Sequence, residues 1–204
     1  MDDKVVKSPK SNLGSDIMFG IENYNPTFYC TINEFIESNG KKLKNVIGKQ
    51  IEYTMVMWEE NDNEWDSDGV VVICVEGYNI EICNKNLNEL SVTINEINFS
   101  SDLEAYDFEK FGKFKFEWRK DALEVLNNIN GRIIKDIELI EYKFESKIKY
   151  NENDTNELGK KQTTYLLNGI GLNLDDGYIS VFNSGDTNGI SNDRDSNRNR
   201  YIRL

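Results

Sequence analysis

Two segments of the chain are repeated, and this internal repeat restricts the folds that the sequence can adopt. Residues 43–51 (LKNVIGKQI) align with residues 126–134 (LNNINGRII) and share with them a leucine, an asparagine, a glycine and an isoleucine. A second similar pair follows in the same order, VEGYNIEICN at 75–84 and LDDGYISVFN at 174–183. The repeat therefore predicts two halves with the same succession of elements, in which each half covers the apolar face of the other.

Both halves contain the residue pattern of β-strands. Apolar and polar residues alternate over 51–57, 113–118 and 140–150, as they do in strands with one buried face. The apolar residues just before residue 140 are out of phase with those that follow. This change of phase predicts a β-bulge near residues 139 and 140.

Other segments predict a central strand and two hairpins. Residues 70–75 (VVVICV) are apolar throughout, which is typical of a strand that is covered on both faces. The glycines of EG at 76–77 and DDG at 175–177 favour tight turns between strands. Tyr78 and Tyr178, which follow these turns, are predicted to pack across neighbouring strands.

Two short segments have the pattern of helices. Residues 31–40 (TINEFIESNG) place Thr31 and Glu34 at the spacing of a capping box, and the final Asn-Gly pair favours a helix stop. Residues 119–128 (RKDALEVLNN) predict a second helix with Asp121 as its N-cap. Helices are therefore expected to be a minor part of the fold.

These patterns predict a mainly β protein of the β-rich α+β type. The expected architecture is an antiparallel sandwich, or two packed curled sheets, built from an internal duplication with one or two short helices. We expect a flexible N-terminal arm at 1–16, a first half at 17–100, a second half at 101–190 with an insertion near 146–162, and a basic tail at 191–204. The two halves are expected to form one compact body.

The charge of the chain favours one class of partner over others. The sequence has 36 acidic and 24 basic residues and a formal charge of −12. This charge repels the phosphates of nucleic acids and attracts a basic protein surface, so we expect a basic protein partner and no nucleic acid. The tail (SNDRDSNRNRYIRL) has the opposite pattern, with four arginines. It either folds back onto the acidic body or stays solvated, and its polarity favours the solvated state.

The absence of histidine excludes the catalytic triads and metal sites that depend on imidazole. We therefore predict a protein that is not an enzyme and has no cofactor. An odd set of cysteines, Cys30, Cys74 and Cys83, favours a reducing compartment, and the pair on the predicted hairpin at 74–83, Cys74 and Cys83, is expected to be buried and structural. No apolar leader or spanning segment is evident, so we predict a cytoplasmic protein that does not contact a membrane.

A strongly acidic run at 59–68 (EENDNEWDSD) is the candidate functional segment. A tryptophan among carboxylates suits contact with an Arg- or Lys-rich partner, although the same indole can instead fold back as a lid on the hairpin. A glycosidase-like carboxylate pair is disfavoured because such runs are usually solvated. The predicted partner-binding residues are Glu59, Glu60, Asp62, Glu64, Trp65, Asp66 and Asp68.

Neither a metal site nor a phosphate site is predicted. An EF-hand starting at Glu64 would need a bidentate glutamate where the chain has Val75, which leaves only a weaker, irregular calcium site as an alternative. Gly169 and Gly171 precede a strand and not a helix, so they do not form a phosphate-binding loop. They are predicted to serve turns or bulges.

In composition and general layout the chain is similar to bacterial immunity proteins, which bind a cognate toxin and block it. That resemblance implies an inhibitor that occludes a basic partner, and it assigns no residues. Our first hypothesis is therefore a non-enzymatic, acidic protein-binding module that contacts its partner through residues 59–68. The alternatives are a carbohydrate-binding or carbohydrate-processing β-sandwich that uses Trp65 and nearby carboxylates, and a phage-derived or structural assembly protein.

Overall fold

A computed structural model describes residues 18–103, 106–108, 112–148 and 160–204. The predicted flexible arm at 1–16 and most of the predicted insertion lie outside these residues. The described chain is mainly β, with two antiparallel sheets and two α-helices, as the sequence predicted. A short 3-10 turn, η1 (Met18–Gly20), precedes them.

The first sheet has the strand order β2-β1-β3-β4-β5, and β8 pairs with β1 outside this path. All of its strand pairs are antiparallel. The strands are β1 (Ile51–Glu59), β2 (Glu64–Trp65), β3 (Val71–Val75), β4 (Tyr78–Lys85), β5 (Glu89–Ile94) and β8 (Phe116–Lys120).

The second sheet has the order β12-β11-β10-β9-β13 and is also antiparallel. Its strands are β9 (Ile134–Ile148), β10 (Lys160–Leu174), β11 (Tyr178–Asn183), β12 (Asn188–Ser191) and β13 (Asn199–Arg203). A separate two-stranded ribbon pairs β6 (Tyr106–Phe108) with β7 (Gly112–Phe114). The predicted strand at 113–118 is thus divided at Lys115 between β7 and β8.

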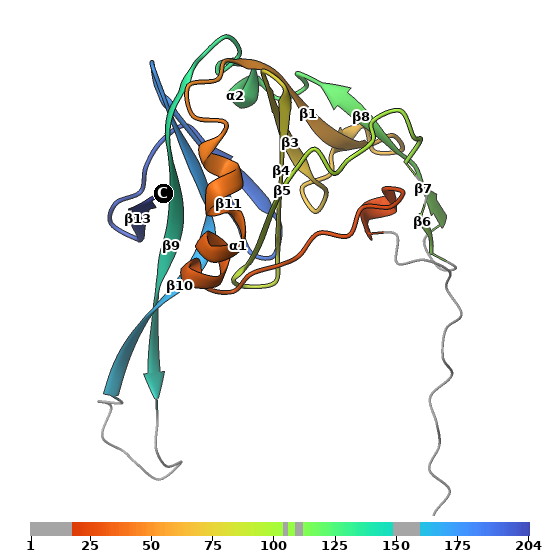
Figure 1. Cartoon of the computed structure of the whole chain (residues 1–204). Helices are drawn as coiled ribbons and strands as arrows, with labels where there is room; N and C mark the ends of the chain where they lie inside the picture. Colours follow the sequence, from red (N-terminus) through yellow and green to blue (C-terminus); the bar gives the residue numbers. More distant parts are fainter. Residues whose placement is uncertain (1–17, 104–105, 109–111, 149–159) are drawn as a thin grey trace, which may run out of the picture.

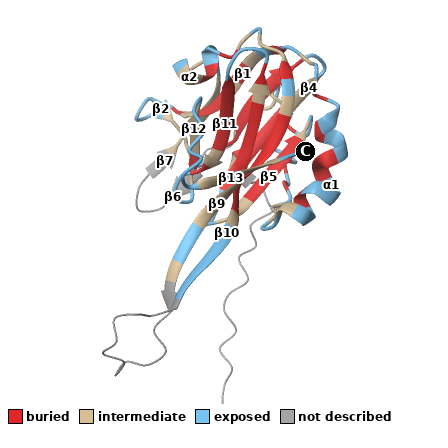
Figure 2. Ribbon diagram, turned by 90° about the vertical axis from the view of Figure 1, so that its left-hand side faces the viewer, coloured by how far each residue is buried: buried red, intermediate tan, exposed pale blue. Residues whose placement is uncertain are grey.

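The two sheets pack face to face and enclose the main core (Figure 1). β4 lies against β11, and β5 lies against β10. Buried residues run along the strands of both sheets, whereas the far ends of β9 and β10 extend from the body and are largely exposed (Figure 2). The architecture is therefore a β-rich sandwich.

The repeated segments meet at a pseudo-twofold axis between the halves. Gly48 N donates to Ile134 O at 2.7 Å, and Gly131 N donates to Ile51 O at 2.8 Å, so each bond is the repeat equivalent of the other. Both glycines have a left-handed backbone, with φ of 84° and 81°, which explains why both copies retain glycine. Two further reciprocal bonds flank them, from Ile51 N to Arg132 O (2.8 Å) and from Ile134 N to Lys49 O (3.0 Å).

The first helix, α1 (Ile32–Lys44), begins where the sequence predicted and ends later. Thr31 is its N-cap and accepts a hydrogen bond from Glu34 N. The predicted stop at Asn39–Gly40 is wrong, because one more turn buries Leu43 completely in the core. Three lysines in this last turn also interact favourably with the helix dipole.

The second helix, α2 (Glu124–Asn127), is a single turn and its predicted cap is wrong. Leu123 occupies the N-cap position without a side-chain hydrogen bond. Asp121 instead holds β1, since its Oδ1 accepts hydrogen bonds from Thr54 N at 2.9 Å and Asn130 Nδ2 at 3.0 Å. α1 contacts β9 of the other half while α2 contacts β1, so each half covers part of its partner.

The outer face of the first sheet is also covered. A second cluster of buried residues, which includes Tyr24, Met57 and Ile97, lies on this face. β3 is buried along its whole length, as expected for a central strand, and Cys74 and Cys83 are buried free thiols within the same cluster. The predicted burial of these two cysteines is confirmed.

The predicted irregularity near residue 140 lies on the neighbouring strand. The register between β9 and β10 shifts between Leu167 and Gly169, opposite Glu141 and Ile140. Asn168 is therefore the extra residue, and the bulge belongs to β10.

The basic tail does not stay solvated as the sequence favoured. Residues 199–203 form β13, which pairs with β9 at the edge of the second sheet. Two interactions hold the tail on β9. The strands pair through backbone hydrogen bonds, and acidic side chains of β9 form ion pairs with arginines of the tail. The four ion pairs of the tail are Arg194–Glu138, Arg198–Asp195, Arg200–Glu141 and Arg203–Asp136.

Candidate functional site

The acidic loop, residues 59–68, runs from the end of β1 through the short β2 toward β3. Glu59 is buried and closes the turn at its start. Its carboxylate accepts hydrogen bonds from Asn61 N at 2.8 Å and Asp62 N at 2.7 Å. Glu59 is thus engaged within the protein, and its predicted contact with a partner has no structural support.

Trp65 lies opposite Trp58 in the β1–β2 pair. The indole of Trp65 is partly buried and packs against the main core, and its Nε1 atom is buried without a hydrogen bond in the described structure. This position favours the interpretation of Trp65 as a lid on the hairpin. Its contact with a partner stays a prediction.

Asp66 is half-buried, and its Oδ1 accepts a hydrogen bond from Asp68 N at 3.1 Å. Burial raises the pKa of the Asp66 carboxyl from its ordinary value of 3.8 to about 6, and the nearby charges of Asp68 and Glu59 act in the same direction. Asp66 therefore carries only part of a negative charge in mildly acidic solution.

Replacing Asp66 by asparagine is expected to remove a pH dependence of stability. The folded protein binds the Asp66 proton more tightly than the unfolded chain, so this group stabilises the fold below pH 3.8, and the effect is lost as pH rises through about 6. Urea unfolding of wild type and Asp66→Asn between pH 4 and 7.5 measures the difference. The wild type should gain about 1–2 kcal/mol relative to the variant as pH falls. Parallel pH curves for the two proteins would contradict this assignment.

The remaining acids of the loop face solvent. They are Glu60, Asp62, Glu64 and Asp68, here called the exposed carboxylates. In the described part of the chain, none of them forms an ion pair. Arg119 donates to Asn63 Oδ1 of the loop at 2.9 Å, but it pairs with Glu117 at 2.5 Å and stacks on the Trp58 ring at 4.5 Å.

The far end of the acidic loop is tied to the second sheet by Asn188, a residue that the sequence did not single out. Asn188 is 2% exposed. Its Oδ1 accepts hydrogen bonds from the backbone and side-chain nitrogens of Asn84, both at 3.0 Å. Its Nδ2 donates to Ser67 O at 3.0 Å and Gly69 O at 2.6 Å. No sequence signal marks this role, because the partners lie on distant segments.

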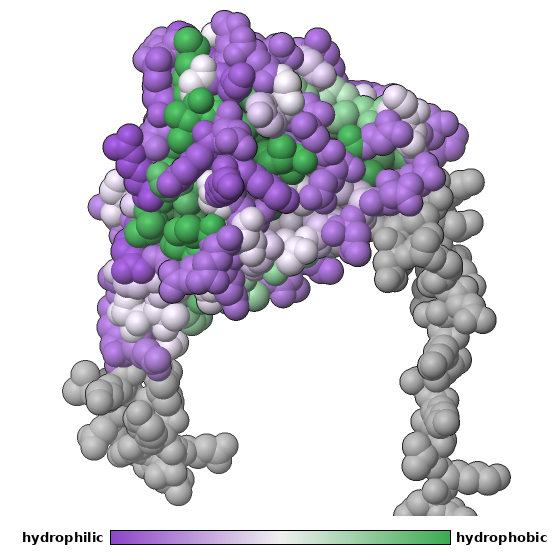
Figure 3. All heavy atoms as spheres, in the orientation of Figure 1, coloured by the Kyte–Doolittle hydropathy of each residue, from purple (hydrophilic) through white to green (hydrophobic). Residues whose placement is uncertain are grey.

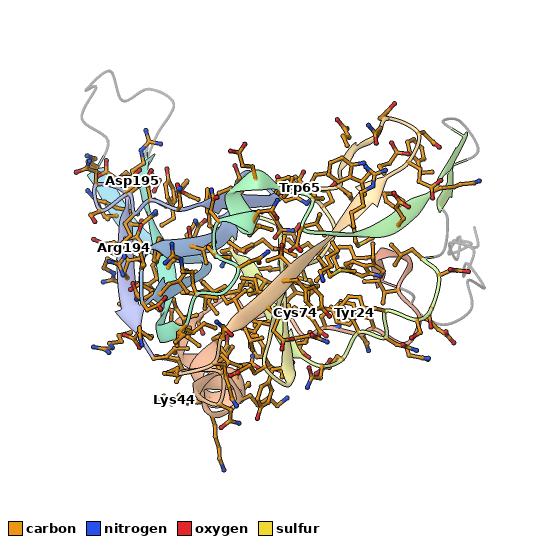
Figure 4. The ribbon with its side chains drawn as sticks, turned by 90° about the horizontal axis from the view of Figure 1, so that it is seen from above. Tyr24, Lys44, Trp65, Cys74, Arg194 and Asp195 are labelled. Atoms are coloured by element: carbon orange, nitrogen blue, oxygen red, sulfur yellow. The ribbon has the colours of Figure 1, made fainter. Side chains whose placement is uncertain are left out.

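Another candidate site, which the sequence did not predict, is a concave surface on the outer face of the second sheet. This outer hollow has a volume of about 260 Å³. Side chains of β9, β10 and β11 line it together with residues of the tail. Neither Trp65 nor any carboxylate of the acidic loop lines the hollow, and Figure 4 shows Trp65 well apart from Arg194 and Asp195 of the tail.

Gly169 and Gly171 belong to this outer face of β10, where a side chain does not fit. A Cβ on Gly169 would lie 2.4 Å from Val181 O, and a Cβ on Gly171 would lie 2.2 Å from the Tyr178 hydroxyl. Gly169 also adjoins the bulge at Asn168, in agreement with the predicted bulge role. Tyr178 packs over Gly171 and against Tyr201, so its predicted packing role is confirmed.

Within the described residues, no group of three or more acidic or cysteine side chains is placed to hold a metal ion. In the same part of the chain, neither α-helix has the length and hydrophobicity of a membrane-spanning segment. No family model matches this chain, and comparison with curated proteins and with solved structures finds no similar protein. Two surfaces therefore stand as candidates, the acidic loop and the outer hollow.

Proposed function

We propose that this protein is a non-enzymatic binding module whose acidic loop occludes a basic protein partner, such as a toxin, in the cytoplasm. The observation that supports this proposal is the contrast between two charged segments. The arginines of the tail are paired with acids of the protein itself, whereas the exposed carboxylates have no cation partner among the described residues. The acidic loop thus presents four carboxylates to solvent within ten residues of the chain.

The acidic loop is held in a defined conformation before any partner binds. Glu59 closes its first turn through two backbone hydrogen bonds, and Asn188 fixes its far end through bonds to Ser67 and Gly69. A loop that is already ordered loses little conformational entropy on binding. This arrangement suits an inhibitor, which must compete with the natural ligand of its target.

Electrostatics also favour this function over nucleic acid binding. Hydrophilic residues cover most of the visible surface of the body, with hydrophobic residues in separate patches (Figure 3). A chain with a formal charge of −12 attracts basic surfaces at long range and speeds their encounter. Nuclease toxins present such surfaces because they bind phosphate backbones, and an acidic loop can occupy the same site.

The proposal is tested by capture of a partner from the lysate of the source cell, followed by affinity measurement with variants. The variant Glu60→Gln/Asp62→Asn/Glu64→Gln/Asp68→Asn should bind the captured basic protein at least tenfold more weakly, and the loss should shrink at high salt, because close charge pairs couple by about 1.5 kcal/mol or more. Titration calorimetry at two salt concentrations measures both effects.

A matched control carries the same change of charge elsewhere. The variant Glu37→Gln/Glu96→Gln/Glu124→Gln/Asp186→Asn removes four exposed carboxylates outside the acidic loop. It should keep nearly full affinity. Equal weakening in both variants would show a general effect of net charge, and capture of no basic protein by the folded wild type would contradict the proposed function.

A further inference from the structure

Apolar residues line the base of the outer hollow, and polar residues line its edge. Ile140 and Tyr142 of β9, Phe182 of β11 and Tyr201 of β13 line it. Ile140 is 2% exposed, although it lies on the face of β9 opposite the one that enters the main core. The outer face of the second sheet thus forms an apolar floor for the hollow, and the tail forms one of its walls.

Asn168 and Asn199 give the hollow polar groups. The bulge in β10 places Asn168 among the lining side chains. Asn168 is 8% exposed. A second lining residue, Asn199, has a buried Oδ1 atom without a partner. A buried amide oxygen normally accepts a hydrogen bond, so Asn199 Oδ1 is an acceptor that a ligand in the hollow can use.

The edge of the hollow carries charges of both signs. Asp193 and Asp195 line it together with Arg198, and the Arg198–Asp195 pair is loose at 4.0 Å. A site for a cation would not present a guanidinium, and a site for an anion would not present two carboxylates. Amides, hydroxyls, carboxylates and a guanidinium together provide both donors and acceptors, which a neutral ligand with several hydroxyl groups can satisfy.

We propose that the outer hollow binds a single sugar ring or a similar small, uncharged polyol. A sugar ring has one apolar C–H face, which fits against Tyr142, Phe182 and Tyr201, and a set of hydroxyls, which fit Asn168 and the polar edge. A volume of 260 Å³ lies just below the range of about 300–1,000 Å³ for ligand pockets, and this size fits one ring and not an oligosaccharide.

This site is independent of the proposed function. The outer hollow shares no residue with the acidic loop, and the two surfaces belong to different sheets. A protein partner at the acidic loop therefore leaves the hollow open, and failure of either proposal does not affect the other.

The test uses the full chain and four free sugars, namely glucose, galactose, mannose and N-acetylglucosamine. Amide NMR spectra of the wild type at up to about 50 mM sugar should show saturable shifts for at least one sugar, confined to Asn168 and the other lining residues. The dissociation constant is expected near 1 mM, which corresponds to a binding free energy of about −4 kcal/mol. No saturable shift at these residues with any of the four sugars would overturn the proposal.

Variants then locate the site. Asn168→Ala should weaken binding about fivefold, which is the loss of one or two hydrogen bonds. Asp193→Ala should also weaken sugar binding. Because Asp193 is an exposed residue at the edge of the hollow, this variant leaves the buried core unchanged. Tyr165→Ala is the control, because Tyr165 is an aromatic residue of β10 that does not line the hollow. Unchanged affinity in Asn168→Ala and Asp193→Ala would overturn the site.

Discussion

Replacing Asn188 by alanine is expected to lower the free energy of unfolding by about 3–4 kcal/mol. The substitution removes four hydrogen bonds of one buried amide and leaves Asn84 N and Gly69 O without these partners, whereas Ser67 O keeps its bond from Asn188 N at 2.8 Å. Each buried group that loses its partner costs about 1–3 kcal/mol, and local relaxation recovers part of this sum. Urea unfolding followed by circular dichroism measures the change.

Two companion variants separate hydrogen bonding from loss of volume. Asn188→Asp keeps the shape and the acceptor but turns the donating amide into an oxygen that faces Gly69 O, so it should destabilise the protein at least as much as alanine does. Asn88→Ala is the control, since Asn88 is only partly buried and its amide makes a single long contact of 3.4 Å with Cys30 O. A loss below about 1 kcal/mol in Asn188→Ala would show that Asn188 does not hold the acidic loop to the second sheet.

Replacing Arg194 by alanine is expected to destabilise the protein by about 3 kcal/mol, at the lower end of the range for a broken buried ion pair because the arginine is 42% exposed. Arg194 makes a bidentate pair with Glu138, at 2.9 and 3.0 Å, and stacks on Tyr178 at 4.6 Å. The side chain of Glu138 is only 9% exposed. Removal of the Arg194 side chain leaves the Glu138 carboxylate buried, with the hydrogen bond from Asn173 Nδ2 still in place.

The control for Arg194 lies in the same segment. Arg198→Ala breaks a pair that is long and exposed on both sides, so it should cost about 0.5 kcal/mol or less. The double variant Arg194→Ala/Glu138→Gln removes both charges and should recover part of the loss, because no unpaired buried charge remains. Hydrogen exchange at residues 199–203 should increase in Arg194→Ala. Equal stability of the Arg194→Ala and Arg198→Ala variants would show that Arg194 does not fasten the tail.

The features that the sequence predicted depend on residues that are close together in the chain. Strand alternation, the hairpin glycines and the Thr31 cap are all short-range signals, and all are found in the structure. The end of α1 was missed because burial of Leu43 outweighs the local preference of Asn39–Gly40 for a stop. The role of Asp121 was missed because its partners, Thr54 and Asn130, do not lie in the helix that it precedes.

The candidate site was predictable only in part for the same reason. Charge density alone pointed to the acidic loop, but it did not separate the exposed carboxylates from the two buried or partly buried acids. Glu59 accepts backbone hydrogen bonds in the first turn, and Asp66 is partly buried and accepts a hydrogen bond from Asp68 N. The outer hollow has no local signature, since it depends on a bulge at Asn168, on two glycines in β10 and on a tail that crosses the sheet. The tail was expected in solvent because its acidic partners on β9 are more than fifty residues earlier in the chain.

The reciprocal bonds at the pseudo-twofold axis have a consequence for assembly. Segment 48–51 of one half recognises segment 131–134 of the other through four backbone hydrogen bonds that do not depend on which chain supplies each half. When two molecules refold together at high concentration, the first half of one can dock on the second half of its neighbour through the same four backbone bonds. The same duplication that closes the sandwich within one chain thus provides a route to a domain-swapped dimer, in which the connection between the halves acts as the hinge.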